Sequence, residues 1–199
     1  MPVLSREEFD AIEFDAAASG DHESAARRMN RLAWAGTETE TMPRSEAFLR
    51  AGEQWLLADD PAAAATGFRL ALADGGPVFV DPRVPLARAL FMLDQPAEAQ
   101  ALLDQLKAEG RRDPRACDLV AELLVERSDL AGALDWATAG VELCLQRQAN
   151  GAPGLADRDS SGDEGGAEAE LRLLLSLRYR IRNDLGLPED RYDELLDEA

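Results

Sequence analysis

The residues of this chain best suited to acid–base or nucleophilic chemistry are one histidine and two cysteines. His22 follows Gly20 and Asp21, a sequence typical of a turn. We therefore expect its ring to be exposed, without the pocket and orienting partner that a general base needs. Cys117 and Cys144 stand at apolar positions of helical periods, which predicts buried core thiols. Neither belongs to a C-x-x-C pair, and with a single histidine the sequence predicts no zinc site.

Acidic and aromatic groups are the next candidates for chemistry. One acidic group lacks the fixed spacing of a calcium-binding loop, so its charges are interpreted as solvated: Asp157, Asp159, Asp163 and Glu164. Trp55 and Trp136 are interpreted as packing residues, whereas Trp34 is expected to be partly exposed near a helix end. The sequence contains no nucleophile elbow, Gly-rich phosphate loop or H-E-x-x-H motif. We therefore predict a protein that is not an enzyme and uses no cofactor or metal.

Composition excludes several classes of ligand. The formal net charge is -18 over 199 residues, so the surface repels nucleic-acid phosphates and anionic membranes. A basic partner is the natural counterpart, and the alternative is that the charge only maintains solubility. We expect no signal peptide, because the first residues are acidic and short of apolar side chains, and no apolar run is long enough to span a bilayer. Abundant arginine and alanine, with two unpaired cysteines, predict a cytoplasmic bacterial protein.

The elements that position these side chains are predicted to be helices throughout. Apolar residues recur at spacings of three and four, the period of an amphipathic helix, and strand patterns are nearly absent. Residues 45–78 form two such helices. The first has an aromatic–small–aromatic set and the second a small–aromatic–small set: Phe48, Gly52 and Trp55, then Ala64, Phe68 and Ala71. Small residues let the two helices approach closely, and the large ones fill the groove between them.

The same arrangement recurs with a period of about 34 residues. Later copies at 80–113 and 114–147 have matching small and apolar residues: Ala87, Leu90, Ala99, Leu103, Leu106, Ala121, Leu124, Ala133, Ala137 and Gly140. A weaker copy at 6–39, followed by an insertion at 40–44, has its own set: Phe9, Ile12, Ala16, Ala25, Met29 and Leu32. The copies depart from the pattern at three places, which hold Glu13, Arg83 and Cys117.

Helix boundaries are marked by capping and breaking residues. Ser5 with Glu8 predicts a capping box at the first helix. Four prolines stand at expected first helical positions, where the missing N–H is tolerated: Pro61, Pro82, Pro96 and Pro114. Gly75 and Gly110 are expected to end the preceding helices. These helix-start and helix-end residues therefore support repeating units of two helices each.

This pattern resembles the tetratricopeptide-repeat family over most of the chain. The resemblance implies an all-α fold, an α-solenoid of about four helix-turn-helix repeats over residues 1–147, followed by a C-terminal capping helix. A helical bundle without repeats is the alternative.

The composition changes after the fourth copy. Residues 148–166 are rich in Gly, Ala, Ser and Asp and are predicted to be a flexible acidic linker. Residues 167–199 are predicted to form an amphipathic helix and a short acidic tail. The helix has an apolar stripe and a basic set: Leu171, Leu174, Leu175, Leu177, Ile181 and Leu185, with Arg172, Arg178, Arg180 and Arg182. We expect this helix to cap the array. The alternatives are an internal ligand in the groove and a contact with a second subunit.

Two stretches resemble the helical portion of bacterial SEC-C-motif proteins, namely residues 135–144 and the segment from Arg182 to Asp190. In that family a cysteine-rich zinc motif accompanies tetratricopeptide-like helices. The zinc motif itself is absent from this sequence, so no metal role is implied.

Partner binding is expected on the surface that tetratricopeptide arrays use, which is lined by the first helix of each unit. The resemblance places sixteen residues there: Glu7, Asp10, Phe14, Ala17, Glu46, Leu49, Glu53, Leu56, Asp81, Val84, Arg88, Phe91, Arg115, Asp118, Glu122 and Val125. The set is acidic with apolar patches. It lacks the lysines and asparagines with which some family members clamp a peptide carboxylate, so that activity is not predicted.

Two functions follow from this set. The first is a protein-interaction module whose groove takes a basic or amphipathic segment. The second is a self-assembling structural protein, a homodimer in which the C-terminal helix contacts the other copy. The bland alternative is that these faces are only solvated.

Overall fold

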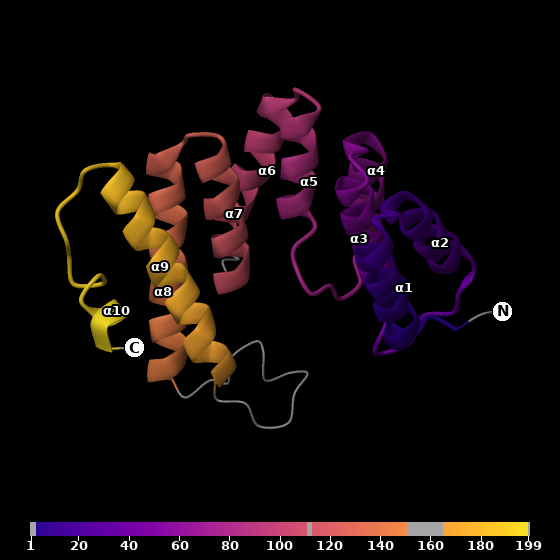
Figure 1. The fold of residues 1–199 in the computed structure, drawn as a ribbon, viewed down its shortest axis with the longest axis horizontal. Coiled ribbons are helices and arrows are strands. Elements are labelled where there is room, and N and C mark those ends of the chain that lie inside the picture. The colour runs from indigo at the N-terminus through magenta and orange to yellow at the C-terminus, as the bar shows by residue number, and fades with distance from the viewer. Residues whose placement is uncertain (1–2, 111–112, 151–164, 199) are drawn as a thin grey trace. The chain divides into compact units, whose positions relative to one another are not determined.

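The computed structural model describes residues 3–110, 113–150 and 165–198 (Figure 1). Within them the protein is all-α, as predicted, and its single β feature is an isolated bridge between Val3 and Thr37. The helices are α1 (Arg6–Ser19), α2 (His22–Ala35), α3 (Arg44–Leu57), α4 (Pro61–Asp74), α5 (Arg83–Met92), α6 (Pro96–Ala108), α7 (Pro114–Glu126), α8 (Leu130–Ala149), α9 (Gly165–Asp184) and α10 (Leu195–Glu198).

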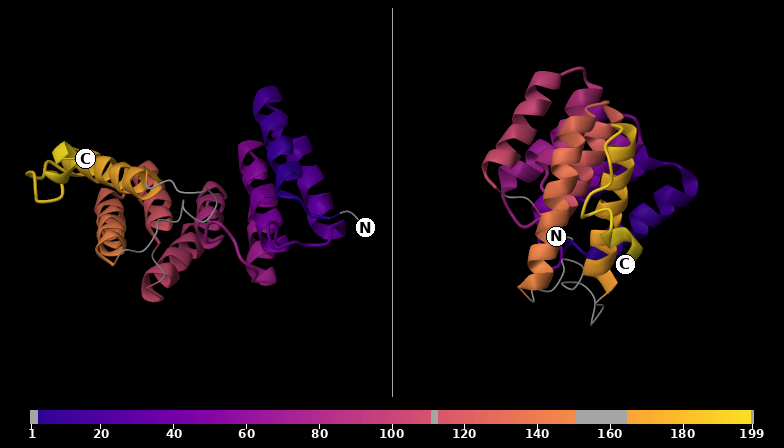
Figure 2. Two further views of the ribbon diagram at one scale, coloured as in Figure 1. Left: turned by 90° about the horizontal axis from the view of Figure 1, so that it is seen from below. Right: turned by 90° about the vertical axis from the view of Figure 1, so that its left-hand side faces the viewer.

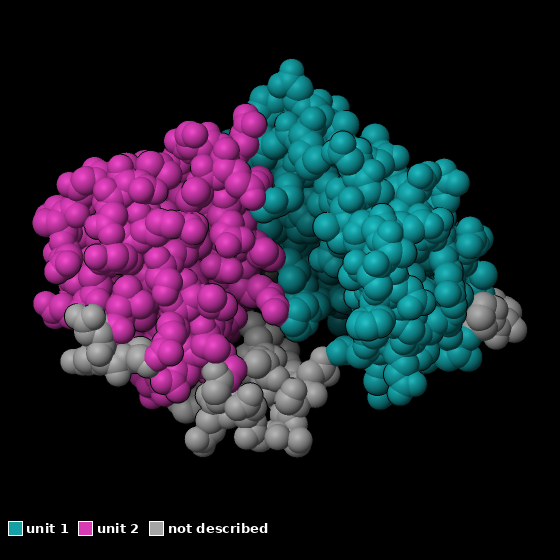
Figure 3. Space-filling view, in the orientation of Figure 1, with its two compact units in different colours: residues 1–105 teal, residues 106–199 magenta. Residues whose placement is uncertain are grey.

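The helices gather into two compact units, residues 1–105 and residues 106–199, called unit 1 and unit 2 below (Figure 3). The division falls inside α6, whereas the sequence predicts a first boundary at 147/148. α8 continues to Ala149 and α9 begins at Gly165. Most of the predicted linker, residues 151–164, lies outside the described residues.

In unit 1, α3 and α4 pack at the close distance that the small residues of the sequence predict. A Cβ placed on Gly52 would lie 2.5 Å from the Phe68 ring, and one on Gly67 would lie 3.1 Å from the Gly52 Cα. Phe48, Trp55 and Phe68 are all buried. Because Gly52 has no side chain, the Phe68 ring occupies the space over it, between the two helices.

Most helix ends follow the predicted punctuation. Asp60 accepts a hydrogen bond from the Ala63 N–H at 2.9 Å, directly before Pro61, and Gly75 ends α4 with a left-handed φ of 70°. The capping box at α1 was a wrong prediction. Ser5 precedes the helix, but its side chain makes no capping hydrogen bond, and the Glu8 carboxylate pairs with Arg28 of α2 at 3.0 Å.

In unit 2, α9 runs alongside α8 and also contacts α7 (Figures 1 and 2). The predicted stripe is buried from Leu171 to Ile181. Leu174 fits closely over Gly140, whose added Cβ would lie 2.8 Å from the leucine Cδ2. Leu185 is an exception, 38% exposed, because α9 ends at Asp184 and the chain turns away there. α9 therefore covers the apolar side of α8, the packing that a capping helix requires.

Candidate interaction surfaces

The outer side of α1 is the most apolar exposed surface among the predicted groove places. Phe9, Ile12 and Ala16 face the core, and the residues on the opposite side are exposed: Glu7, Asp10, Phe14 and Ala17. Phe14 is 76% exposed. A large aromatic side chain surrounded by water on a helix flanked by acids is chemically suited to a partner with apolar and basic groups.

Arg50 of α3 joins this side of α1 to α3. Its guanidinium donates to Glu13 at 2.7 Å and to Asp10 at 2.6 Å, and lies 5.6 Å from the centroid of the Phe9 ring. Burial of Arg50 opposes its charge, but the hydrogen bonds to Glu13 and Asp10 outweigh that effect and raise the pKa of Arg50. Arg50 is therefore fully engaged in positioning two carboxylates.

Two more acids and an apolar side chain continue this surface along α3. Glu46, Arg50, Glu53 and Leu57 are spaced by four, three and four residues, so they share one side of the helix. Glu46 accepts a hydrogen bond from the Phe79 N–H at 2.8 Å, and burial raises its pKa against the effect of that bond. Leu57 is 60% exposed. We call this surface the acidic face: Glu7, Asp10, Glu13 and Phe14 of α1, with Glu46, Glu53 and Leu57 of α3.

Other predicted groove residues do not join the acidic face. Leu49 and Val84 are buried, which corrects their placement on an open surface. The reason for Leu49 is that α3 packs against both α2 and α4, so more of its circumference is covered than a single contact would cover. Asp81 instead pairs with Arg83, which lies two residues away, at 2.7 Å.

The remaining predicted residues lie on α5 and α7. Arg88 and Phe91 are half-buried on α5. Arg115, Asp118 and Glu122 lie on α7 and hence in unit 2. Burial, followed by the nearby Glu122 charge, raises the pKa of Asp118. The face described above therefore contains only residues of α1 and α3.

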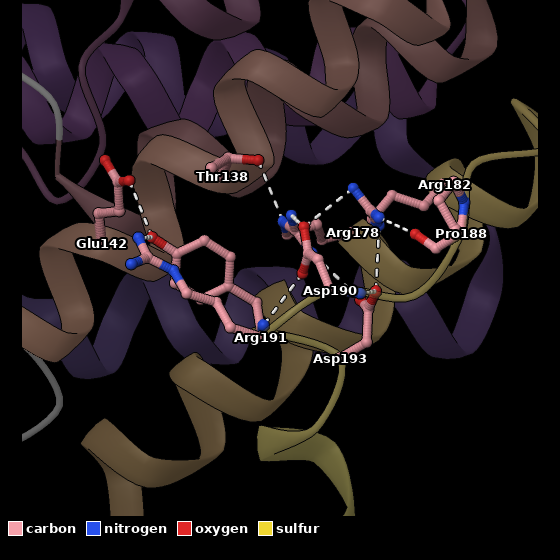
Figure 4. Close-up of polar contacts among 9 residues, drawn as sticks. Thr138, Glu142, Arg178, Arg182, Pro188, Asp190, Arg191 and Asp193 are labelled. Carbon is pink, nitrogen blue, oxygen red and sulfur yellow. Dashed lines mark hydrogen bonds and ion pairs between the residues drawn. The ribbon is translucent and has the colours of Figure 1, made fainter.

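A buried ion-pair cluster in unit 2 was not predicted from the sequence (Figure 4). Arg178 of α9 is only 3% exposed and donates to Thr138 at 3.1 Å, to Asp190 at 3.0 Å and to Asp193 at 3.1 Å. Arg182, one turn further, pairs with Asp193 at 3.0 Å and with Asp190 at 2.9 Å. The hydrogen bond from Arg178 lowers the pKa of Asp190.

The carboxylates of this cluster come from the segment after α9, residues 186–196, which we call the C-terminal hook. It turns at Gly186, where φ is 67°, and brings α10 back beside α9. Tyr192 packs with Val141, Cys144 and Leu171, and its hydroxyl donates to Glu142 at 2.9 Å. The Arg178 guanidinium lies 4.7 Å from the centroid of the Tyr192 ring. These contacts hold the C-terminal hook against α8 and α9.

The histidine and the two cysteines are buried or half-buried side chains that pack in or beside the core. The prediction that His22 is exposed in a turn is wrong. His22 is the first residue of α2 and is half-buried, and its Nδ1 lies 2.9 Å from Oε1 of the buried Gln54. Cys117 and Cys144 are buried thiols, as predicted, and burial raises the pKa of Cys144 to about 12. Cys144 therefore stays protonated at neutral pH.

The tryptophans follow the predicted division. Trp55 and Trp136 are buried, whereas Trp34 is 66% exposed, with its ring edge-on to Phe48 at a centroid distance of 5.2 Å.

A hollow of about 170 Å³ lies between α1 and α2, and its ionisable lining side chains are Asp15, Asp21 and Arg28. Asp21 accepts a hydrogen bond from the Ser24 N–H at 3.1 Å, which caps α2 and lowers the pKa of Asp21. Within the described residues, no three His, Cys, Asp or Glu side chains are grouped to hold a metal ion.

Comparison of the chain with family models, with curated proteins and with solved structures finds no match. Among the helices of the described segments, none combines the length and the apolar character needed to cross a membrane.

Proposed function

We propose that this protein is a non-enzymatic interaction module of the tetratricopeptide-like kind, and that its acidic face binds a basic amphipathic segment of a partner. The observation that carries the proposal is Phe14, an aromatic side chain that is 76% exposed on a helix flanked by carboxylates. Burying such a side chain in a partner contributes on the order of 2 kcal/mol, and aromatic anchors of this kind dominate many interfaces.

The charges of the acidic face support a basic partner. The acidic face contains five carboxylates, and two of them, Asp10 and Glu13, pair with the neighbouring Arg50 of α3. The excess negative charge favours lysine or arginine on the approaching surface, and Phe14 and Leu57 favour an apolar stripe beside those basic groups. An amphipathic helix presents both kinds of group at once.

The test compares partner capture by three purified chains: wild type, Phe14→Ser and Trp34→Ser. Trp34 is the matched control, because it is a similarly exposed aromatic residue on α2, outside the acidic face. A partner that belongs to the acidic face is retained by wild type and Trp34→Ser and lost by Phe14→Ser. After purification, its affinity falls about tenfold or more with Phe14→Ser and weakens as salt is added. Equal capture by all three chains contradicts the proposal.

A further inference from the structure

We infer that a second copy of this chain binds the acidic face through the outer side of its α9, so that copies associate head to tail. This inference rests on the proposed function and names its partner. It begins from the side of α9 opposite the buried stripe, which carries Arg172, Leu173, Ser176, Tyr179, Arg180 and Asn183.

The middle of the outer side of α9 is basic and partly apolar in a chain whose net charge is -18, with the exposed acids Glu168 and Asp184 near the two ends of the helix. Arg172 and Arg180 are exposed, and neither pairs with an acid anywhere in the described segments, whereas Arg178 and Arg182 are neutralised by the C-terminal hook. Leu173, between the two exposed arginines in sequence, is 64% exposed. Tyr179 adds a partly exposed aromatic ring.

The two surfaces have complementary chemistry. Arg172 and Arg180 are eight residues apart, about 12 Å along a helix, so both charges can lie over neighbouring carboxylates of the acidic face. Leu173 and Tyr179 offer apolar area to Phe14 and Leu57. The outer side of α9 is therefore a basic amphipathic surface of the kind that the acidic face requires.

Charge also decides which surface of a second copy is involved. Two α9 helices packed on each other would bring arginines against arginines, and two acidic faces would bring carboxylates against carboxylates, so both symmetric contacts are disfavoured. Only the contact between unlike surfaces pairs opposite charges. Where a dimer forms through a single contact of this kind, one acidic face and one α9 stay available, so association can continue to further copies.

Two surface variants of the full chain test this inference. The first, Glu7→Arg with Phe14→Ser, alters the acidic face without touching the carboxylates that bind Arg50. The second, Arg172→Glu with Arg180→Glu, alters α9 without touching the arginines that bind the C-terminal hook. Circular dichroism establishes that each variant is folded, and sedimentation velocity at about 0.15 M salt, where distant charges are screened, measures assembly over a concentration series.

We expect the wild type to assemble with rising concentration and each variant alone to stay monomeric. An equimolar mixture of the two variants should form a dimer and nothing larger, because the mixture contains one intact copy of each surface. A wild type that stays monomeric at every concentration overturns the inference. So does a wild type that assembles while the mixture stays monomeric. If Phe14→Ser still loses a foreign partner in the capture experiment, the proposed function stands although the inference fails.

Discussion

At the scale of single residues, the packing of α3 on α4 depends on what Gly52 and Gly67 lack. Each glycine lies where a methyl group would meet the neighbouring helix, and the Phe68 ring fills the space over Gly52. In an ordinary helix, replacing glycine by alanine is favourable by up to about 1 kcal/mol, because the backbone is less free in the unfolded chain. The local contact and the general helix preference therefore act in opposite directions here.

Gly52→Ala is expected to destabilise the protein by about 1–3 kcal/mol. The added methyl group would lie 2.5 Å from the Phe68 ring, so the ring or the helices must move, and that cost exceeds the gain in helix preference. Urea unfolding followed by circular dichroism measures the change. Thr66→Ala on the exposed side of α4 is the control and should change the stability by less than about 0.5 kcal/mol. A stabilising effect of Gly52→Ala would show that the helices are not in close contact.

His22→Ala is expected to cost about 1–2 kcal/mol, although the sequence alone predicts an exposed ring. Gln54 is buried on α3, and its side-chain oxygen is bonded to the His22 ring across 2.9 Å, so removal of the ring leaves a buried polar group without that partner. Glu23→Ala, at the neighbouring exposed position, is the control. Unfolding midpoints that coincide for wild type and His22→Ala would mean that this hydrogen bond contributes nothing.

At the scale of elements, ion pairs hold the C-terminal hook against α9. Arg178 lies almost entirely inside the protein, and its guanidinium is satisfied by one hydroxyl and two carboxylates. Burying a cation costs free energy unless the cation is paired with an acid. The burial of Arg178 therefore depends on the carboxylates that the C-terminal hook supplies. The Tyr192 ring adds apolar contact with α8 and α9 on the same side.

Asp193→Ala is expected to destabilise the protein by about 3–5 kcal/mol, the usual cost of removing one partner of a buried ion pair. Both Arg178 and Arg182 bind this carboxylate, so the variant leaves two arginines with fewer acceptors. Glu189→Ala, at an exposed position of the same hook, controls for general effects of losing an acid there. Thermal unfolding measures both variants. If Asp193→Ala melted together with Glu189→Ala, the cluster would have no role in stability.

Local patterns predicted most helices but not the hook, for a physical reason. The helical period and the positions of proline and glycine are local signals, because they depend on residues close together in the sequence. These signals correctly predicted α3, α4 and the end of α4 at Gly75. The bond between Arg178 and Asp193 joins residues fifteen positions apart across a turn, and no periodicity marks it. Leu185 was assigned to the buried stripe because the apolar spacing continues past the point where the helix stops.

The surface residues were harder to predict than the helices. The repeat pattern gives each place on a first helix the same exposure, but neighbouring helices cover the copies unequally. Phe14 lies on α1, which packs mainly on α2, and is exposed, whereas Leu49 on the doubly covered α3 is buried. Arg50 was not among the predicted surface residues, although its spacing from Glu46 and Glu53 places all three on one side of α3. That spacing is the signal that identifies it.

At the scale of the whole molecule, the two units carry equal charge, and each contains buried residues of its own. Residues 1–105 contain eighteen acidic and nine basic side chains, and residues 106–199 contain twenty-one and twelve, so each unit carries half of the net charge of -18. The aromatic contact between α3 and α4 lies in unit 1, and the Arg178 cluster lies in unit 2. Since a compact unit with its own core opens by its own equilibrium, damage to one core is expected to act locally.

Hydrogen exchange in Asp193→Ala tests this independence. The loss of the carboxylate acts on Arg178 and Arg182, so amides of α7, α8 and α9 should exchange at least tenfold faster, because a tenfold change corresponds to about 1.4 kcal/mol of the local opening free energy. Amides of α1 to α4 should keep their wild-type rates, because their core contains none of the affected contacts. Gly52→Ala is the matched experiment and should accelerate α3 and α4 while leaving α7 to α9 unchanged. Equal acceleration in both units, in either variant, would show that residues 1–199 open as one cooperative body, as an uninterrupted helical array would.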